Sequence, residues 1–376
     1  VKSGNKPGRK KGHKRSAPTV SQNPDETIRV SKVATCTCGC KTIDKEEISR
    51  DLITIKIITH TTQYVGTKTV CPCCNKEYMP KFPSNVKSII NYDEDIKSLV
   101  VYLNSYCNVP NQKTIELLGL LSDEKIKMCQ GTVGNIIKQF SKKSQPILRK
   151  IKRSIIKEPV INEDETPITV NGKIMSVIGV FTKKLSITEA FARRNLESFE
   201  DMGILDRYIG VVCHDHNPIH RRFKKSKQAE CNFHILRYCK SELEVHKRES
   251  IKSFMEYLLK IRDKVDEYRI QGRKSFNDEE YEETKKEYLR LLEIWQEDHK
   301  EDYKKRKITA YYESEKRLIA RLKEYVDDHL RFTTDFRIDF TNNLAERGLR
   351  KIKSKLKVAG SFRSLQYAKY DCDAIS

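Results

Sequence analysis

The sequence predicts an α/β protein. Residues 158 to about 217 contain three strand-like runs, rich in β-branched residues and separated by turn residues: PVINEDETPITV, KIMSVIGVFTKKLSITEAFA and DRYIGVVCHDH. From residue 218 to about 335, apolar residues recur instead at helical spacing, as in Tyr281, Tyr288 and Leu292. We interpret these stripes as core packing rather than as a cofactor site. Strands and helices of this extent favour a mixed fold with a substantial core.

The chain carries a strong positive charge. Its 376 residues include 73 Lys and Arg against 52 Asp and Glu, which gives a formal net charge of +21. An excess of this size indicates a polyanionic partner, with nucleic acid first and an anionic membrane second. No apolar run approaches the roughly 20 residues that a membrane span needs, and no signal peptide is visible. We therefore expect a nucleic-acid partner and no membrane.

The sequence divides into four consecutive regions. Residues 1–30 form a basic arm rich in Gly and Pro, which is either a solubilising tail or a contact to nucleic acid. Residues 31–83 hold two cysteine groups. Residues 84–157 show helical spacing, for which helix–turn–helix DNA binding and plain helical packing are alternatives. Residues 158–376 hold the strands, the charged helices and a final basic segment.

The cysteines of residues 31–83 form two short groups that a strand-like run, LITIKIITHTTQYVG, separates. Zinc takes four soft ligands in a tetrahedron, and two short cysteine groups can supply two ligands each. We predict a structural zinc ribbon whose ligands are Cys36, Cys38, Cys71 and Cys74, with Cys40 as a spare. We expect these cysteines to be metal-bound thiolates in a reducing cytoplasm, and the alternative is a set of buried free thiols.

Three carboxylates far apart in the sequence are candidates for a catalytic metal centre. Asp164 and Asp215 each follow an apolar strand-like run, and Glu346 stands at the head of a predicted helix. Phosphoryl transfer on DNA uses two divalent cations about 3.5–4 Å apart, and Mg²⁺ prefers oxygen ligands. Carboxylates at the ends of adjacent strands, together with one from a helix, meet that need.

Each carboxylate also has a simpler interpretation. Asn343 and Glu346 match a capping box, in which Glu346 reaches back to the start of its own helix. Asp164 precedes Pro167 and suits a turn. Asp215 lies between two histidines, so this segment is also a candidate for a separate metal cluster.

The segment FTNNLAERGLRKIKSKLKVAGSFRS places one acid ahead of a run of Lys and Arg. A solvated helix usually mixes its charges more evenly. We expect Glu346 to complete the metal centre and the helix after it to hold DNA phosphates. The proposed phosphate contacts are Arg347, Arg350, Lys351 and Lys353.

Four motifs in this order resemble the IS66-type transposases of bacterial insertion sequences. They are the KPGRKKGHKR arm before the cysteine groups, DETP at 164–167, an aspartate after an apolar strand followed by Cys231-Asn-Phe-His234, and NNLAERGLRKIK…GSFRS. The last motif is the longest and most specific, and the resemblance extends from about residue 6 to the end. Departures from the family pattern are His216, Asn232-Phe233 and Lys351, where Gly, Trp-Ala and Pro are usual.

The resemblance implies a DDE-type transposase with an RNase H-like catalytic core. Asp164, Asp215 and Glu346 would hold Mg²⁺ or Mn²⁺ in that core. The 131 residues between Asp215 and Glu346 (346 − 215) imply a helical insertion at about 235–335. Cys231 and His234 match the C-x-x-H element of the family, with a structural role and a partial metal site as alternatives.

The resemblance further implies phosphodiester cleavage at the ends of a mobile element and strand transfer into target DNA. Expected partners are both DNAs, further copies of the chain in a synaptic complex, and accessory proteins of the same element. The expected location is the cytoplasm, at the nucleoid. Alternatives are a non-catalytic zinc-ribbon DNA-binding protein derived from a transposase, and an RNase H-like nuclease acting on RNA or branched DNA.

Overall fold

The structure is a computed structural model that describes residues 20–55, 57–305 and 310–376. The chain divides into two units, residues 1–61 and residues 62–376, which are described separately. Residues 1–19 of the predicted basic arm lie outside the described residues.

The described part of the first unit contains no regular helix or strand. An isolated β-bridge between Thr35 and Lys41 closes a tight turn around the first cysteine group. Within this turn the N–H of Cys36 donates to the carbonyl of Cys40, with an N···O distance of 2.9 Å. Gly39 has φ +89°, a left-handed conformation that favours glycine.

The second cysteine group lies in the turn of a short antiparallel hairpin, formed by β1 (Thr69–Val70) and β2 (Glu77–Tyr78). The prediction of a longer strand at residues 52–66 is wrong, because no described residue of that run forms a strand. Its side chains are largely exposed, and no neighbouring strand takes up its backbone hydrogen bonds. An alternating pattern without a partner does not make a strand.

The central feature of the second unit is a five-stranded mixed sheet. Its strands are β3 (Val160–Val170), β4 (Lys173–Phe181), β5 (Ser186–Phe191), β6 (Val211–His214) and β7 (Lys227–Glu230). The order across the sheet is β5-β4-β3-β6-β7. The first three strands pair antiparallel as a meander, whereas β6 and β7 run parallel to β3.

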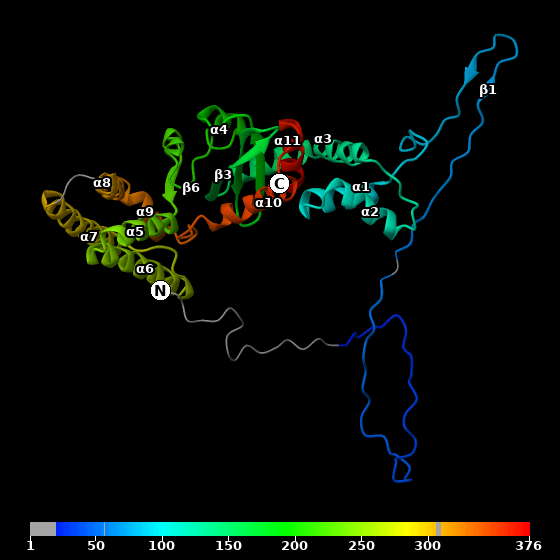
Figure 1. The fold of residues 1–376 in the computed structure, drawn as a ribbon, viewed down its shortest axis with the longest axis horizontal. Coiled ribbons are helices and arrows are strands. Elements are labelled where there is room, and N and C mark those ends of the chain that lie inside the picture. The colour runs from blue at the N-terminus through cyan, green and yellow to red at the C-terminus, as the bar shows by residue number, and fades with distance from the viewer. Residues whose placement is uncertain (1–19, 56, 306–309) are drawn as a thin grey trace. The chain divides into compact units, whose positions relative to one another are not determined.

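Helices cover both faces of this sheet (Figure 1). Alternate residues of β4 show the division: Ile178 and Val180 belong to one apolar core, and Val177 and Phe181 belong to another. The first core includes residues from α3 (Gln130–Ile155) and α4 (Leu196–Met202). The second includes residues from α10 (Asn343–Ala359) and α11 (Leu365–Ile375).

The helical region before the sheet packs onto it. It consists of α1 (Glu94–Val101), a π-helical turn (Tyr102–Tyr106), α2 (Asn111–Leu121) and α3. Helix α3 contacts α11 and β5, and it buries Leu148 and Ile155 against the sheet. Helix α3 thus takes part in helical packing, and helix–turn–helix DNA binding by this region stays a prediction.

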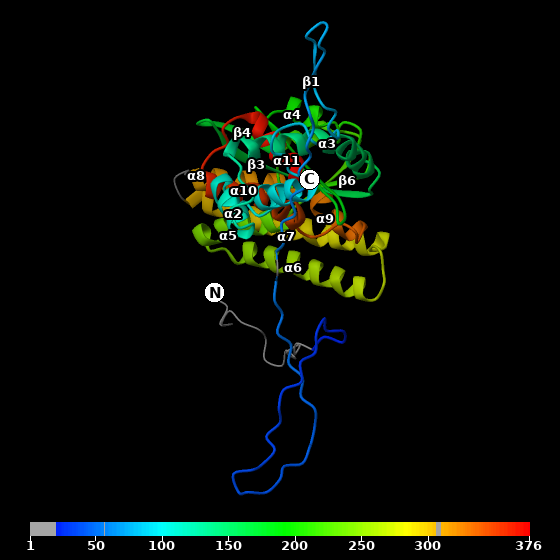
Figure 2. The same ribbon diagram turned by 90° about the vertical axis from the view of Figure 1, so that its right-hand side faces the viewer.

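Between β7 and α10 lies a bundle of helices, which corresponds to the expected insertion. Its members are α5 (Asn232–His246), α6 (Glu249–Ile270), α7 (Asp278–Lys305), α8 (Ala310–Glu324) and α9 (Val326–Thr334). Helices α6 and α7 lie side by side (Figures 1 and 2). Tyr288, Leu292 and Trp295 of α7 are completely buried in the bundle core, as their spacing predicts.

Among the described residues, no helix combines the length and the apolar character needed to cross a membrane.

Candidate metal centre

The register of the sheet brings Asp164 and Asp215 together. β3 and β6 run parallel, with Asn162 opposite Cys213. Asp164 and Asp215 each come two residues later, so they lie on the same face of neighbouring chain segments. Neighbouring strands are about 4.8 Å apart, so carboxylates on adjacent strands can reach the same cation.

The next strand, β7, places Cys231 on the same sheet face, beside Asp215. His214 of β6 pairs with Glu230 of β7, and each is followed by a residue of the same face, Asp215 and Cys231. The N–H of Cys231 donates to the carbonyl of His214 with an N···O distance of 3.0 Å, which continues the ladder. Helix α5 begins directly afterwards, so its first turn places His234 beside this row.

Glu346 comes from the first turn of α10, which packs on β3 and β4. Ala345 and Leu349, which come before and after Glu346 in this helix, are completely buried against the sheet. Gly348 permits the close approach, because a Cβ at this position would overlap the ring of Phe181. The helix therefore holds the Glu346 carboxylate over the same sheet face as Asp164.

The capping-box interpretation of Glu346 is wrong. The N-cap residue of α10 is Asn342 rather than Asn343, and no side chain caps the helix. Instead, Asn342 is completely buried and joins three segments. Its Nδ2 donates to the carbonyl of Glu163 (2.7 Å), its Oδ1 accepts from Asn162 (2.9 Å), and its N–H donates to Cys231 Sγ (3.2 Å). This residue positions the start of α10 and was not predicted from the sequence.

Four side chains converge at this point. One ligand atom each of Asp215, Cys231, His234 and Glu346 lies within 4.8 Å of the other three. Among the described residues this is the one group of three or more His, Cys, Asp or Glu side chains close enough to hold a metal ion. Asp164 lies outside this group of four but interacts electrostatically with both Asp215 and Glu346.

The electrostatics of these carboxylates suit a cation. Burial, followed by the charge of Asp215, raises the pKa of Asp164 to about 7, and Glu346 contributes in the same direction. Lys353 of α10 opposes this shift. Contact with the Asp215 carboxylate, followed by the Cys231 thiol, raises the pKa of His234 to about 10. A divalent cation would relieve the mutual repulsion of the carboxylates, so the residues present fit such an ion.

The opposite face of β3 carries a separate polar set. Glu163 forms a buried pair with His220, and Glu165 contacts Arg194 and accepts from Asn217 with an N···O distance of 2.6 Å. Glu165 therefore points away from Asp164, as alternation along a strand requires. The alternative of a turn at Asp164 is wrong, because β3 continues through Pro167 to Val170.

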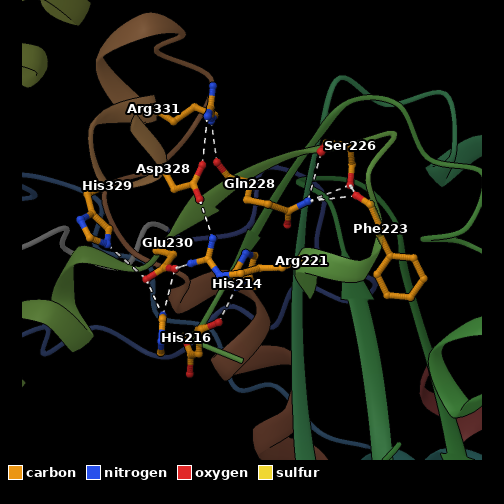
Figure 3. Close-up of polar contacts among 11 residues, drawn as sticks. His214, His216, Arg221, Phe223, Ser226, Gln228, Glu230, Asp328, His329 and Arg331 are labelled. Atoms are coloured by element: carbon orange, nitrogen blue, oxygen red, sulfur yellow. Dashed lines mark hydrogen bonds and ion pairs between the residues drawn. The ribbon is translucent and has the colours of Figure 1, made fainter. Parts of the chain in front are cut away.

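The two histidines beside Asp215 do not form a metal cluster with it. His214 stacks on His220 with ring centroids 4.0 Å apart. His216 donates from Nδ1 to the buried carboxylate of Glu230, at 2.9 Å (Figure 3). Neither residue belongs to the group of possible ligands, so the HDH alternative does not hold within the described residues.

Glu230 is the centre of a polar network that links β7 to helix α9. Besides His216, it contacts Arg221 and His329, and Arg221 also donates to Asp328 of α9, as Figure 3 shows. Burial alone would raise the pKa of Glu230, but the contacts with His216 and His329 lower it well below the usual range of a glutamate. The strand next to the candidate metal centre is thereby tied to the helices between β7 and α10.

The basic residues of α10 differ in their exposure. Arg347, Arg350 and Lys353 are exposed, whereas Lys351 is half-buried. The ammonium of Lys351 lies 4.0 Å from the ring centroid of Tyr106. Three of the four predicted phosphate contacts are thus exposed on the helix that carries Glu346.

The six N-terminal cysteines are not buried, so the alternative of buried thiols is wrong. The backbone N–H of Cys38 lowers the pKa of Cys36, and the N–H of Cys74 lowers the pKa of Cys71. These are the two predicted ligand pairs, and a lowered thiol pKa suits a metal ligand. The two pairs belong to different units of the chain, so the zinc ribbon stays a prediction.

Comparison with known proteins agrees with the geometry. No curated protein matches the sequence. The profile of the transposase IS66 family matches residues 92–370, a range that includes the sheet, the helical insertion and the converging side chains. The chain belongs to the IS66 family of transposases.

Proposed function

We propose that the protein is a metal-dependent DNA transposase that cleaves phosphodiester bonds at the ends of a mobile element and transfers the freed strand to target DNA. The observation that carries the proposal is the proximity of Asp215 to Glu346 on the sheet face that also carries Asp164, whose carboxyl group interacts electrostatically with both, within a chain of the IS66 family. This convergence joins residues that are 51 and 131 positions apart (215 − 164 and 346 − 215).

The topology supports an RNase H-like core. A meander of three antiparallel strands followed by two strands parallel to the first is the arrangement that the sequence resemblance implies. Asp164 lies on the first strand of this sheet, Asp215 follows the fourth, and the glutamate comes from a helix packed on it. The helical insertion separates the second and third acids in sequence without separating them in space.

The three carboxylates would hold Mg²⁺ or Mn²⁺. When bound, such ions lower the pKa of a ligand hydroxyl and neutralise charge on the phosphate. Asp164 and Asp215 are held by the sheet, and Glu346 is held by the packing of α10. Because their supports are rigid elements, the carboxylates are preorganised for the ions.

The exposed cations of α10 would orient the DNA backbone. Arg347 and Arg350 lie one and four residues after Glu346, so a phosphate bound to them is held near the metal centre. Neutralising phosphates also provides affinity that does not depend on sequence. This arrangement explains a single acid at the head of a basic helix.

The proposed reaction has two balanced steps. In the first, water adds to phosphorus, the bond to the 3′ oxygen breaks, and the products are a 3′ hydroxyl and a 5′ phosphate. In the second, this 3′ oxygen attacks a phosphorus of target DNA, one 3′ oxygen of the target leaves, and a proton passes from the attacking to the leaving hydroxyl. The second step conserves the number of phosphodiester bonds.

The same proposal extends to the N-terminal region and to the assembly. The cysteine pairs would hold a structural zinc ion, and the basic arm would contact DNA. Joining two element ends requires more than one copy of the chain, so we propose a homo-oligomeric synaptic complex in which accessory proteins of the element take part.

Replacement of Asp164 by Asn tests the proposed function. The variant should lose Mg²⁺-dependent strand cleavage by at least about 100-fold, since it removes one metal ligand, and should keep its DNA affinity within about threefold. Equal loss of cleavage and DNA binding would show that Asp164 is structural. If the unmodified chain binds DNA but does not cleave it in the presence of Mg²⁺ or Mn²⁺, the result would instead favour the non-catalytic alternative.

A further inference from the structure

The four converging side chains are an unusual set for magnesium. Asp215 and Glu346 offer carboxylate oxygens, but Cys231 offers sulfur and His234 offers nitrogen. Mg²⁺ binds oxygen and avoids these softer donors. Zinc binds thiolate, imidazole and carboxylate together and takes four ligands in a tetrahedron.

The positions of the buried atoms point to a shared ligand. Asp215 Oδ1 and His234 Nδ1 lie 3.0 Å apart as an ion pair, and neither of these buried atoms forms a hydrogen bond in the structure. His234 is only 8% exposed, so solvent access does not explain the arrangement. Buried oxygen and nitrogen atoms that lie close together without hydrogen bonds are available to a shared metal ion.

The sulfur atom is held in place beside these two groups. Cys231 is 4% exposed, and the N–H of Asn342 donates to its Sγ at 3.2 Å. Asn342 also binds the strand that carries Asp164 and begins the helix that carries Glu346. One residue therefore fixes the relative positions of the thiol and the carboxylates.

We propose that Asp215, Cys231, His234 and Glu346 form a zinc site that overlaps the magnesium centre. Bond lengths of 2.0–2.3 Å place tetrahedral zinc ligands roughly 3.3–3.8 Å apart, so ligand atoms within 4.8 Å need only small side-chain rotations. Zinc at this site occupies two of the three proposed magnesium ligands and leaves only Asp164. Zn²⁺ is thus an inhibitor that competes with Mg²⁺, a consequence that rests on the proposed function.

Direct cobalt binding tests the site without any DNA reaction. The full chain carrying Cys71→Ser and Cys74→Ser, which removes one predicted N-terminal ligand pair, is titrated with Co²⁺. We expect one equivalent to bind with tetrahedral absorption bands and a sulfur-to-cobalt charge-transfer band. Adding Cys231→Ser should abolish the charge-transfer band and weaken binding by at least about 100-fold, more than the removal of a residue that only supports a ligand.

Three further variants control this titration. Cys107→Ser removes an exposed thiol outside the group and should change nothing. Asp164→Asn removes a magnesium ligand that lies outside the group and should keep the band. His234→Gln, checked for folding by circular dichroism, should weaken Co²⁺ binding as Cys231→Ser does. The zinc site would be overturned if the charge-transfer band persisted in Cys231→Ser. It would also be overturned if the affinity for Co²⁺ were unchanged in both Cys231→Ser and His234→Gln.

Competition with Mn²⁺ tests the overlap. Bound Mn²⁺, followed by electron paramagnetic resonance, should be released by one equivalent of Zn²⁺ from the chain with Cys231, and not from the chain with Cys231→Ser. Retention of Mn²⁺ beside bound Zn²⁺ would contradict the overlap. Failure of the chain to bind Mn²⁺ at all would sink the magnesium centre of the proposed function, whereas the cobalt titration decides the zinc site independently.

Discussion

Two individual residues, Asn342 and Gly348, set the position of Glu346. Asn342 fixes the first turn of α10 through hydrogen bonds to β3 and to Cys231. Gly348 allows that turn to approach the ring of Phe181. Neither residue bears a charge or belongs to the group of possible metal ligands, yet both determine where a carboxylate lies.

Gly348→Ala should destabilise the protein by about 1–3 kcal/mol, because the added methyl group overlaps Phe181 in a packed core. Chemical denaturation measures the free energy of unfolding. Gly131→Ala is the matched control, since its Cβ would meet only Cys129 Sγ at an ordinary 3.6 Å. The control should be neutral or slightly stabilising in helix α3. Equal effects of the two substitutions would contradict the overlap with Phe181.

Among the elements, the junction of β7 with α9 connects the sheet to the helical insertion. Glu230 is 5% exposed and contacts Arg221, His216 and His329 at this junction. A buried carboxylate among three partners is stable only while all of them remain in place.

Glu230→Gln should cost about 3 kcal/mol or more of unfolding free energy, because it removes the buried negative charge that Arg221, His216 and His329 share and leaves Arg221 with Asp328 alone. Hydrogen exchange should become faster in β7 and α9 and stay unchanged in α11. Glu244→Gln, which alters an exposed ion pair with Lys240, is the control and should change stability by less than about 1 kcal/mol. Unchanged exchange in α9 would show that the network does not join these elements.

The sequence predicts some of these elements well and others poorly, for physical reasons. The strand-like runs of residues 158–217 form β3 to β6, because their apolar residues are buried on both faces of the sheet. The run at residues 52–66 has a similar pattern but no partner strand within the described residues. An alternating pattern of apolar residues does not determine whether a partner strand is present in the fold.

The site shows the same contrast. Asp215 directly follows β6, as its apolar run predicts, whereas Asp164 lies within β3, which continues to Val170. The register of the parallel pair, rather than a shared strand end, brings these two residues side by side. Asn342 and Glu230 are not predictable, because their roles depend on the register of strands and on helices far away in the chain. The spacing of Asn343 and Glu346 suggests a capping box, but tertiary hydrogen bonds to Asn342 override it.

For the whole molecule, the positive charge is the dominant property. The formal net charge of +21 is spread over the chain, but the exposed cations of α10 lie on the helix that carries Glu346 of the candidate metal centre. General charge attracts DNA to any surface, whereas cations beside the proposed catalytic acids would determine which phosphate is presented.

Double replacement of Arg347 and Arg350 by Ala should weaken DNA binding, because two cations that neutralise phosphates are removed. The slope of log affinity against log salt should fall by about one for each phosphate that the variant no longer neutralises. Fluorescence anisotropy over a range of salt concentrations measures that slope. Lys247→Ala with Lys260→Ala removes the same charge from exposed positions of the helical insertion. If this control lowers the slope as much as the α10 variant does, DNA does not bind preferentially at α10.

The central claim is that Asp164, Asp215 and Glu346 together bind divalent metal, and anomalous diffraction from crystals grown with Mn²⁺ tests it most directly. We expect Mn²⁺ on this face of the sheet, with oxygens of all three carboxylates at about 2.1 Å from an ion. Mn²⁺ bound elsewhere, or a Glu346 carboxylate that stays away from ions held by the two aspartates, would contradict the claim.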